Sequence, residues 1–227
     1  MRMRIISAAV CFLLAFSALL PASALSMNLP LTFVLDAGHG GEDGGAVSAD
    51  GLKESEVNLA VAQRVDALLA LCGHHAVLTR DSETLNYPES ADTTRQRKRY
   101  DQNRRVELVN GTENAVLVSI HQNQYVTAGP SGAQVFYGKQ PGSEALAQRM
   151  QSLLSGLCDK QRQAAPISED IFLMREAECP AILIECGFLS NPGDAALLRT
   201  EDYRTALSVY ITAACIGCAE ELKSIHG

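Results

Sequence analysis

The sequence predicts a single layered α/β domain in which a mostly parallel, twisted sheet is flanked by helices. Short apolar runs of strand length alternate along the chain with longer segments that repeat apolar residues at helical spacing. The chain has 227 residues, of which 47% are hydrophobic and 20% charged, and this suits an ordered globular domain of ordinary size. No internal repeat or second composition regime divides it.

The N-terminal segment is typical of a targeting signal and lies outside this fold. Arg2 and Arg4 precede an apolar stretch, and residues 21–24 end in an Ala-x-Ala cleavage pattern. The stretch is shorter than the roughly 20 apolar residues of a membrane span. We therefore predict a signal peptide over 1–24, with an N-terminal membrane anchor as the alternative, and an exported domain over 25–227.

The first half of the domain contains three apolar runs of strand length with helices between them. The runs are short and each is followed by polar or glycine residues, which is typical of buried parallel strands. Apolar residues from Val57 to Leu69 recur every three or four positions, as on one face of a helix. The expected elements are strand 31–35, a glycine-rich loop 37–53, helix 54–72, strand 75–78, helix 95–109 and strand 115–120.

The second half continues the alternation. Leu146, Met150 and Leu153 share one helical face, and a second long amphipathic pattern ends the chain. We expect Asn191-Pro192-Gly193 to stop the segment after the last strand. The expected elements are strand 133–137, helix 146–157, strand 181–184 and helix 203–222.

Three polar residues together form the pattern of a catalytic zinc site. His39 lies in the glycine-rich loop, Glu54 starts the first helix, and His121 follows an apolar strand. Two imidazoles and one carboxylate leave a fourth tetrahedral position open for water, so Zn²⁺ is the expected cofactor. Alone, each histidine would suit a packed core, and acids are favoured at helix N-termini. Glu56 competes with Glu54 on composition.

Glu185 ends an apolar run and is the predicted general base. A carboxylate beside a zinc-activated water can accept its proton and pass it to the leaving amine. The alternative is that Glu185 only orients a zinc ligand by hydrogen bonding. Asp36 also ends a strand close to His39, where it would either orient a histidine or form a turn.

Four stretches, taken together, resemble the zinc-dependent N-acetylmuramoyl-L-alanine amidases (amidase type 3), which cut the bond between the peptidoglycan glycan and its stem peptide. A further run, SGAQVFY at 131–137, resembles the sporulation and germination branch of that family. Gln122 departs from the small residue usual in the family. The four stretches are LDAGHGG at 35–41, GLKE at 51–54, SIHQN at 119–123 and ECGFLSNP at 185–192.

The resemblance implies a peptidoglycan hydrolase that cleaves the amide between N-acetylmuramic acid and L-alanine. His39, Glu54 and His121 would hold Zn²⁺, and Glu185 would act on the water. Asn123 is a predicted ligand-orienting or substrate-binding residue. Arg175 would bind a stem-peptide carboxylate, unless it is an ordinary surface arginine.

The resemblance also bears on location and partners. It implies an extracytoplasmic protein of the cell wall or membrane, and the sporulation branch implies the forespore, muramic-lactam formation in the spore cortex and an activating protein partner. Two other functions remain as alternatives. One is a catalytically silent peptidoglycan-binding protein, and the other is a zinc carboxypeptidase acting on wall peptides.

The charge balance argues against a nucleic-acid partner. The formal charge is −7, and it becomes −9 without residues 1–24, which hold two arginines and no acid. The exception is a basic run over 95–99, continued by Arg104 and Arg105. Such a run is typical of a solvated helix face. Its alternative role is contact with an anionic wall polymer or with substrate carboxylates.

Overall fold

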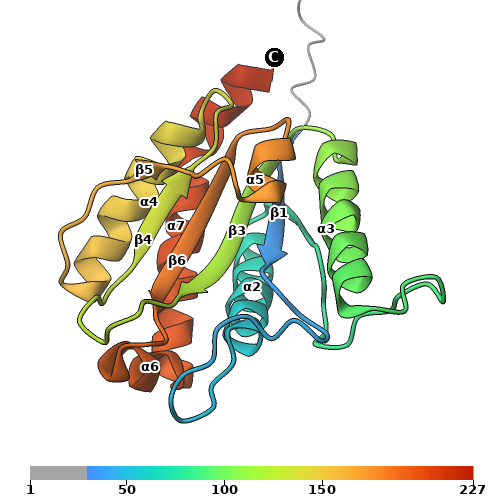
Figure 1. The fold of residues 1–227 in the computed structure, drawn as a ribbon. Helices are drawn as coiled ribbons and strands as arrows, with labels where there is room; N and C mark the ends of the chain where they lie inside the picture. The colour runs from blue at the N-terminus through green and yellow to red at the C-terminus, as the bar shows by residue number, and fades with distance from the viewer. Residues whose placement is uncertain (1–29, 227) are drawn as a thin grey trace, which may run out of the picture.

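A computed structural model describes residues 30–226 and confirms the predicted α/β domain. Within these residues, six strands form one sheet in the order β2-β1-β3-β6-β4-β5, with six helices packed around it (Figure 1). Neighbouring strands are parallel except for β4, which runs antiparallel to β6. The predicted signal peptide or anchor at 1–24 lies outside the described residues.

Most elements lie where the sequence predicts them, with shifted ends. The strands are β1 (Thr32–Ala37), β2 (His75–Leu78), β3 (Ala115–Asn123), β4 (Gln134–Tyr137), β5 (Ala165–Pro166) and β6 (Ala181–Phe188). The helices are α2 (Glu54–Leu71), α3 (Thr94–Gly111), α4 (Ser143–Cys158), α5 (Phe172–Glu176), α6 (Pro192–Leu198) and α7 (Glu201–His226).

Two expectations about element ends are wrong. β3 and β6 extend past their apolar runs, so His121 and Glu185 lie inside the strands and pair with each other in register. Asn191-Pro192-Gly193 begins a helix instead of only ending a segment. The Asn191 side chain accepts hydrogen bonds from the backbone N–H groups of Gly193 and Asp194, and proline is tolerated at the first helical position.

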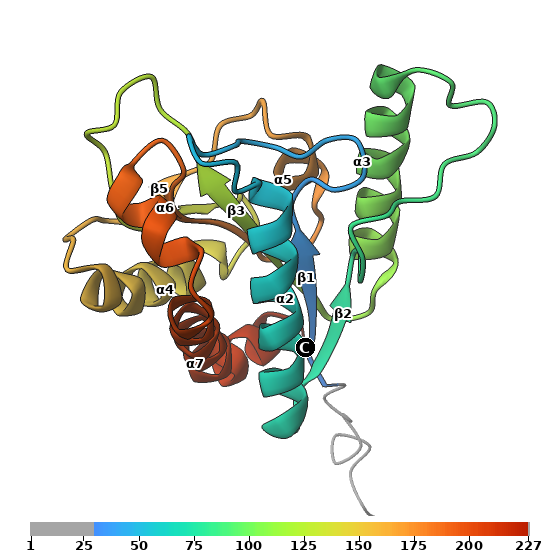
Figure 2. The same ribbon diagram turned by 90° about the horizontal axis from the view of Figure 1, so that it is seen from below.

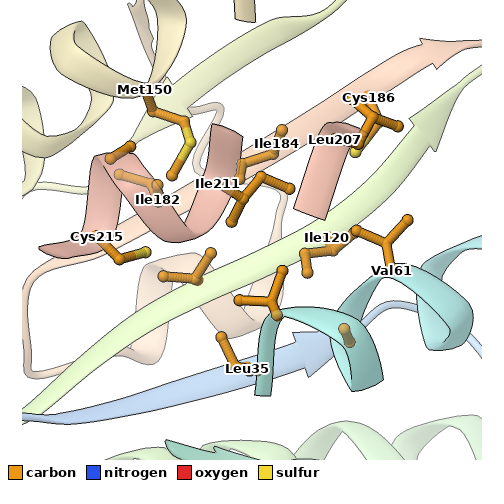
Figure 3. Close-up of a cluster of buried hydrophobic side chains, with 14 of the residues drawn as sticks. Leu35, Val61, Ile120, Met150, Ile182, Ile184, Cys186, Leu207, Ile211 and Cys215 are labelled. Atoms are coloured by element: carbon orange, nitrogen blue, oxygen red, sulfur yellow. The ribbon is translucent and has the colours of Figure 1, made fainter. Parts of the chain in front are cut away.

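The helices cover the two faces of the sheet unequally. α2, α4 and α7 lie on one face, and α3 and α5 lie on the other, as the two views show (Figures 1 and 2). Leu35, Ile120 and Ile184 of three neighbouring strands pack against Val61 of α2 and Ile211 of α7 in the larger core (Figure 3). A smaller apolar cluster lies under α3 and α5.

Strand alternation decides which residues reach the smaller face. Ile120 and Ile184 belong to the larger core, whereas Leu117 and Leu183 belong to the cluster under α3 and α5. Successive side chains of a strand point to opposite faces, so His121 and Glu185 share the face of Leu117 and Leu183. These polar residues therefore lie at the carboxyl ends of β3 and β6, where ligands of such sheets bind.

The helix α7 is long and apolar enough, by length and composition alone, to cross a membrane over Glu201–Ser224. Half of that segment is buried, and Leu207, Ile211 and Leu222 are core residues. Packing against α2 and α4 accounts for the apolar composition of this helix.

Candidate active site

A cavity of about 580 Å³ opens at the carboxyl ends of the central strands. His39, Glu54, His121, Asn123 and Glu185 all line it. Five of the six predicted site residues therefore meet in one place, although they come from four separate parts of the chain.

The three predicted zinc ligands converge within this cavity. The Nδ1 atom of His121 lies 2.9 Å from Glu54 Oε1, and the Nε2 atom of His39 lies 3.4 Å from the same oxygen. One candidate ligand atom from each residue lies within 4.8 Å of the others. The Glu54 side chain is 4% exposed and the two imidazoles are 21–22% exposed, so water can reach the histidines.

Close backbone packing makes this convergence possible. His39 has a φ of 60°, in the left-handed region that non-glycine residues rarely adopt. A Cβ atom on Gly38 would lie 2.3 Å from the His121 ring, and one on Gly45 would lie 2.5 Å from Glu54 Oε2. The glycines of this loop therefore let two ligand side chains approach its backbone.

Glu54 is held as a carboxylate by several hydrogen bonds. Its Oε2 accepts the backbone N–H of Ala46 at 2.8 Å, and its Oε1 accepts the backbone N–H of Gln122 at 3.0 Å. Burial alone would raise the pKa of Glu54, but the neighbouring His121 and His39 hold that pKa well below its usual range. Glu56, by contrast, is exposed and lies 3.9 Å from Lys53, so Glu54 is the acid that reaches the histidines.

Asp43 is the carboxylate on the outer side of His39. Its Oδ1 lies 3.1 Å from His39 Nδ1, at ion-pair distance without the alignment of a hydrogen bond, and its Oδ2 lies 2.8 Å from Lys98 Nζ. Burial alone would lower the pKa of His39, but Asp43 and Glu54 outweigh it and raise that pKa to about 9.

Asp36 bonds to other side chains and not to a histidine ring. Its carboxylate accepts hydrogen bonds from Arg105 at 2.6 Å and from Ser119 at 2.6 Å. Burial would raise the pKa of Asp36, but the charges of Arg105 and His121 and these hydrogen bonds lower it to about 2. Arg105 also donates to the carbonyl oxygen of His39 at 2.7 Å, so this buried pair anchors the ligand loop.

Glu185 has the position and the pKa expected of a group that exchanges protons near neutral pH. It is the register partner of His121, and neighbouring strands lie about 4.8 Å apart. Its Oε2 is buried and has no hydrogen-bond partner among the described residues. Burial raises the pKa of Glu185 to about 7. An unpartnered carboxyl group with such a pKa can exchange a proton with a group in the cavity near neutral pH.

The donor set and its spacing fit a zinc ion. Two imidazole nitrogens and one carboxylate oxygen are typical of catalytic zinc sites. Ligand atoms bound at about 2.0–2.1 Å in a tetrahedron lie roughly 3.3 Å apart. The 2.9 and 3.4 Å separations around Glu54 Oε1 are close to this value. Glu185 lines the same cavity.

Arg175 is the predicted site residue that lies elsewhere. It borders a separate pocket of about 140 Å³ and is absent from the lining of the main cavity. Its guanidinium lies 5.2 Å from the ring centre of Phe172, and Phe172 and Leu173 are the α5 residues that line the cavity. Its role in substrate binding stays a prediction.

Sequence reasoning missed the polar residues behind the ligands. Asn58 donates to the Gly38 carbonyl at 3.0 Å and lies 3.4 Å from Glu54 Oε1, while Gln122 donates to Asn58 at 3.1 Å. Asn58 lies four positions after Glu54 on the same helix, and Asp43 lies four positions after His39. These spacings are visible in the sequence, but polar residues at such spacings occur on many helices and loops.

Comparisons with known proteins agree with this geometry. Residues 33–216 match the sequence model of the N-acetylmuramoyl-L-alanine amidase family. The chain is 40% identical over 189 residues to the germination-specific N-acetylmuramoyl-L-alanine amidase of Bacillus subtilis, covering 81% of this chain and 79% of that one. It is 28% identical to the LytC amidase of the same species over 76% of this chain and 32% of that longer protein.

Solved structures give the same result. The CwlD amidase of Clostridioides difficile, determined in complex with the GerS lipoprotein, superposes with a TM-score of 0.78 at 33% identity. That match covers 86% of this chain and 99% of the solved one. The AmiC2 amidase of Nostoc punctiforme superposes with a TM-score of 0.71 at 28% identity, over 84% and 97% of the two chains.

Proposed function

The chain belongs to the N-acetylmuramoyl-L-alanine amidase family, and we propose that it hydrolyses peptidoglycan by zinc-assisted cleavage of the amide between N-acetylmuramic acid and L-alanine. One observation carries the chemical part of this proposal. Two histidines and a buried glutamate converge in a cavity that is also lined by Glu185, whose buried Oε2 has no hydrogen-bond partner among the described residues. Neither a peptidoglycan-binding protein nor a purely structural site needs that combination.

In this proposal His39, Glu54 and His121 hold the ion. Zinc, when bound, supplies a Lewis acid that polarises a carbonyl and lowers the pKa of a water ligand to ~7. The chain's own residues do the rest of the positioning. Hydrogen bonds from the Gln122 backbone and the Asn58 side chain fix the orientation of the Glu54 carboxylate. The Asp43 carboxylate, paired with His39, does the same for that imidazole.

Glu185 moves the proton. Its carboxylate accepts a proton from the water that attacks the lactyl carbonyl, while a bond forms between the water oxygen and the carbonyl carbon. When the carbon–nitrogen bond breaks, the same carboxyl group returns that proton to the departing nitrogen of L-alanine. Asn123, at the end of β3, lines the cavity, and in this proposal it holds the substrate by hydrogen bonds.

Digestion of purified peptidoglycan tests this function. Residues 25–227 with added zinc should release stem peptides that begin at L-alanine, identified by mass spectrometry. Glu185→Gln should lose at least about 100-fold in rate while keeping its zinc, because it removes only the proton acceptor. Release of single terminal amino acids would instead establish a carboxypeptidase, and zinc binding without any release would favour a binding protein or a missing partner.

The relatives extend the proposal to the cell. Cell-wall amidases act outside the cytoplasm, so we propose that residues 1–24 export this chain as a signal peptide or hold it as an anchor. The 40% identity to a germination-specific amidase supports a role in spore-cortex peptidoglycan and in the forespore compartment. Because the CwlD amidase was solved with a lipoprotein, a protein partner is part of this proposal.

A further inference from the structure

The first turns of α3 carry a basic stripe to which the proposed chemistry assigns no role. Arg95 and Arg99 are exposed, and neither has a hydrogen-bond or ion-pair partner among the described residues. They lie in a chain of formal charge −7, which would repel an anionic substrate. Two unpaired arginines therefore lie near the cavity of a protein whose net charge is otherwise unfavourable to anionic ligands.

The other cations around the cavity are already neutralised. Lys98 pairs with Asp43 at 2.8 Å, and Arg105 pairs with Asp36 and with Asp101. Arg97 forms an ion pair with Glu42. Positive charge that is available to a ligand at this rim thus comes from Arg95 and Arg99.

Helical spacing places both arginines on one flank of α3, next to the cavity-lining residue Gln102. Arg95, Arg99, Gln102 and Val106 are separated by four, three and four positions, so they form one stripe along the helix. Gln102 lines the cavity, and Val106 packs on the apolar cluster that contains Leu173 of α5. The arginine end of this stripe therefore continues the wall of the cavity outwards, beyond Gln102, along the side that faces α5.

Resting on the proposed function, we propose that this stripe binds the stem-peptide arm of the substrate through its carboxylates. The scissile amide joins two arms of different chemistry, because the glycan arm consists of uncharged N-acetylated sugars and the peptide arm carries acidic groups and a free C-terminus. A carboxylate beside a guanidinium gains a charge-assisted hydrogen bond that a sugar hydroxyl cannot equal. The peptide arm consequently leaves the zinc cavity along α3.

Enzyme kinetics on two soluble substrates test this proposal. One substrate is N-acetylmuramic acid carrying the stem peptide with free carboxylates, and the other is the same compound with those carboxylates amidated. The test variant is Arg95→Gln/Arg99→Gln. Arg104→Gln is the matched control. Arg104 is an exposed arginine of the same helix with no partner among the described residues, and it lies seven positions after Arg97, on the flank opposite to Arg95 and Arg99.

We expect the double variant to raise KM about five- to tenfold on the free-carboxylate substrate, with kcat within about twofold, since exposed ion pairs are individually weak. On the amidated substrate the same variant should change KM less than about twofold. Equal losses on both substrates, an equal loss in Arg104→Gln, or no loss at all would overturn the proposal.

Calorimetry of the free stem peptide separates this proposal from the proposed activity. If the wild type cleaves neither substrate, as a binding protein or an enzyme without its partner would, weaker binding of the free peptide to the double variant than to the wild type would still support the stripe. Unchanged peptide binding would overturn it. If the double variant instead loses binding only to wall preparations that carry phosphate polymers, the stripe serves an anionic polymer and the assignment to the peptide is wrong.

Discussion

Gln122 shows how a single side chain supports the ligands from behind. Its backbone N–H donates to Glu54 Oε1, and its side-chain amide donates to Asn58, which in turn contacts both Glu54 and the Gly38 carbonyl. Gln122 is 3% exposed, so these amides replace water as hydrogen-bond partners. Gln122 thus supports Glu54 directly and, through Asn58, the Gly38 carbonyl that precedes His39.

Replacing this side chain should weaken metal binding. Gln122→Ala leaves the Asn58 carbonyl oxygen buried without its donor, and we expect a loss of about 1–3 kcal/mol in the free energy of unfolding. Zinc affinity, measured by competition with a chelator, should fall roughly tenfold or more, as is typical when a group behind a metal ligand is removed. Gln124→Ala is the control, since Gln124 lines the cavity but has no hydrogen bond to this network. Equal zinc affinity in both variants would contradict the account.

His39 should make zinc binding depend on pH. Because the pKa of His39 is about 9, this imidazole is protonated at neutral pH in the metal-free protein. Its protonation stabilises the fold fully below the ordinary histidine pKa near 6.5, and this stabilisation is lost as the pH rises through about 9. Zinc must displace the proton, so its affinity should rise by up to about tenfold per pH unit between pH 6.5 and 9.

Chelator competition across that pH range measures this dependence. Calorimetry in buffers of different ionisation enthalpy should show about one proton released per zinc at pH 7.5. Asp43→Asn removes one of the groups that raise the pKa of His39 and should flatten the profile. A zinc affinity that is independent of pH in the wild type would show that His39 binds no proton in the metal-free site.

At the scale of elements, the loop between β1 and α2 determines how closely the ligands meet. Gly38→Ala would place a Cβ atom 2.3 Å from the His121 ring, so the ring or the loop must move. We expect this variant to fold but to lose at least about tenfold in zinc affinity, because metal ligands tolerate little displacement. Gly44→Ala is the control: its Cβ atom would lie 3.6 Å from Lys53 in ordinary contact. If both variants bind zinc equally, loop packing does not set the ligand geometry.

The elements themselves were largely predictable, because apolar periodicity reports burial. All strands except β5, and the helices α2, α4 and α7, follow the apolar runs. The two-residue strand β5 was not predicted, and the other errors concentrate at element ends. β3 and β6 continue through His121 and Glu185, since backbone pairing between strands does not depend on apolar side chains. The short helices α5 and α6 have too few turns for a periodic signal, and α6 is recognised by its Asn191 cap and Pro192 instead.

At the scale of the whole molecule, the meeting of the candidate ligands was predictable and their surroundings were not. His39, Glu54, His121 and Glu185 are identified by resemblance to a family, and the fold brings them to one cavity. Arg105 and Asp36 are 69 positions apart, and their buried ion pair follows from how α3 packs against the sheet. Arg175 lies near the last strand in sequence, yet α5 directs it to a different pocket. Long-range packing of this kind leaves no local pattern in a single sequence.

One titration tests the central claim that these residues form a hydrolytic zinc site. Metal-stripped protein would receive zinc in steps, and bound zinc and stem peptide released from peptidoglycan would be measured in the same samples. We predict that release is absent without metal and rises in proportion to bound zinc up to one equivalent, with His121→Ala failing to bind that equivalent. Full release from the metal-stripped protein, or a bound equivalent that His121→Ala retains, would contradict the account.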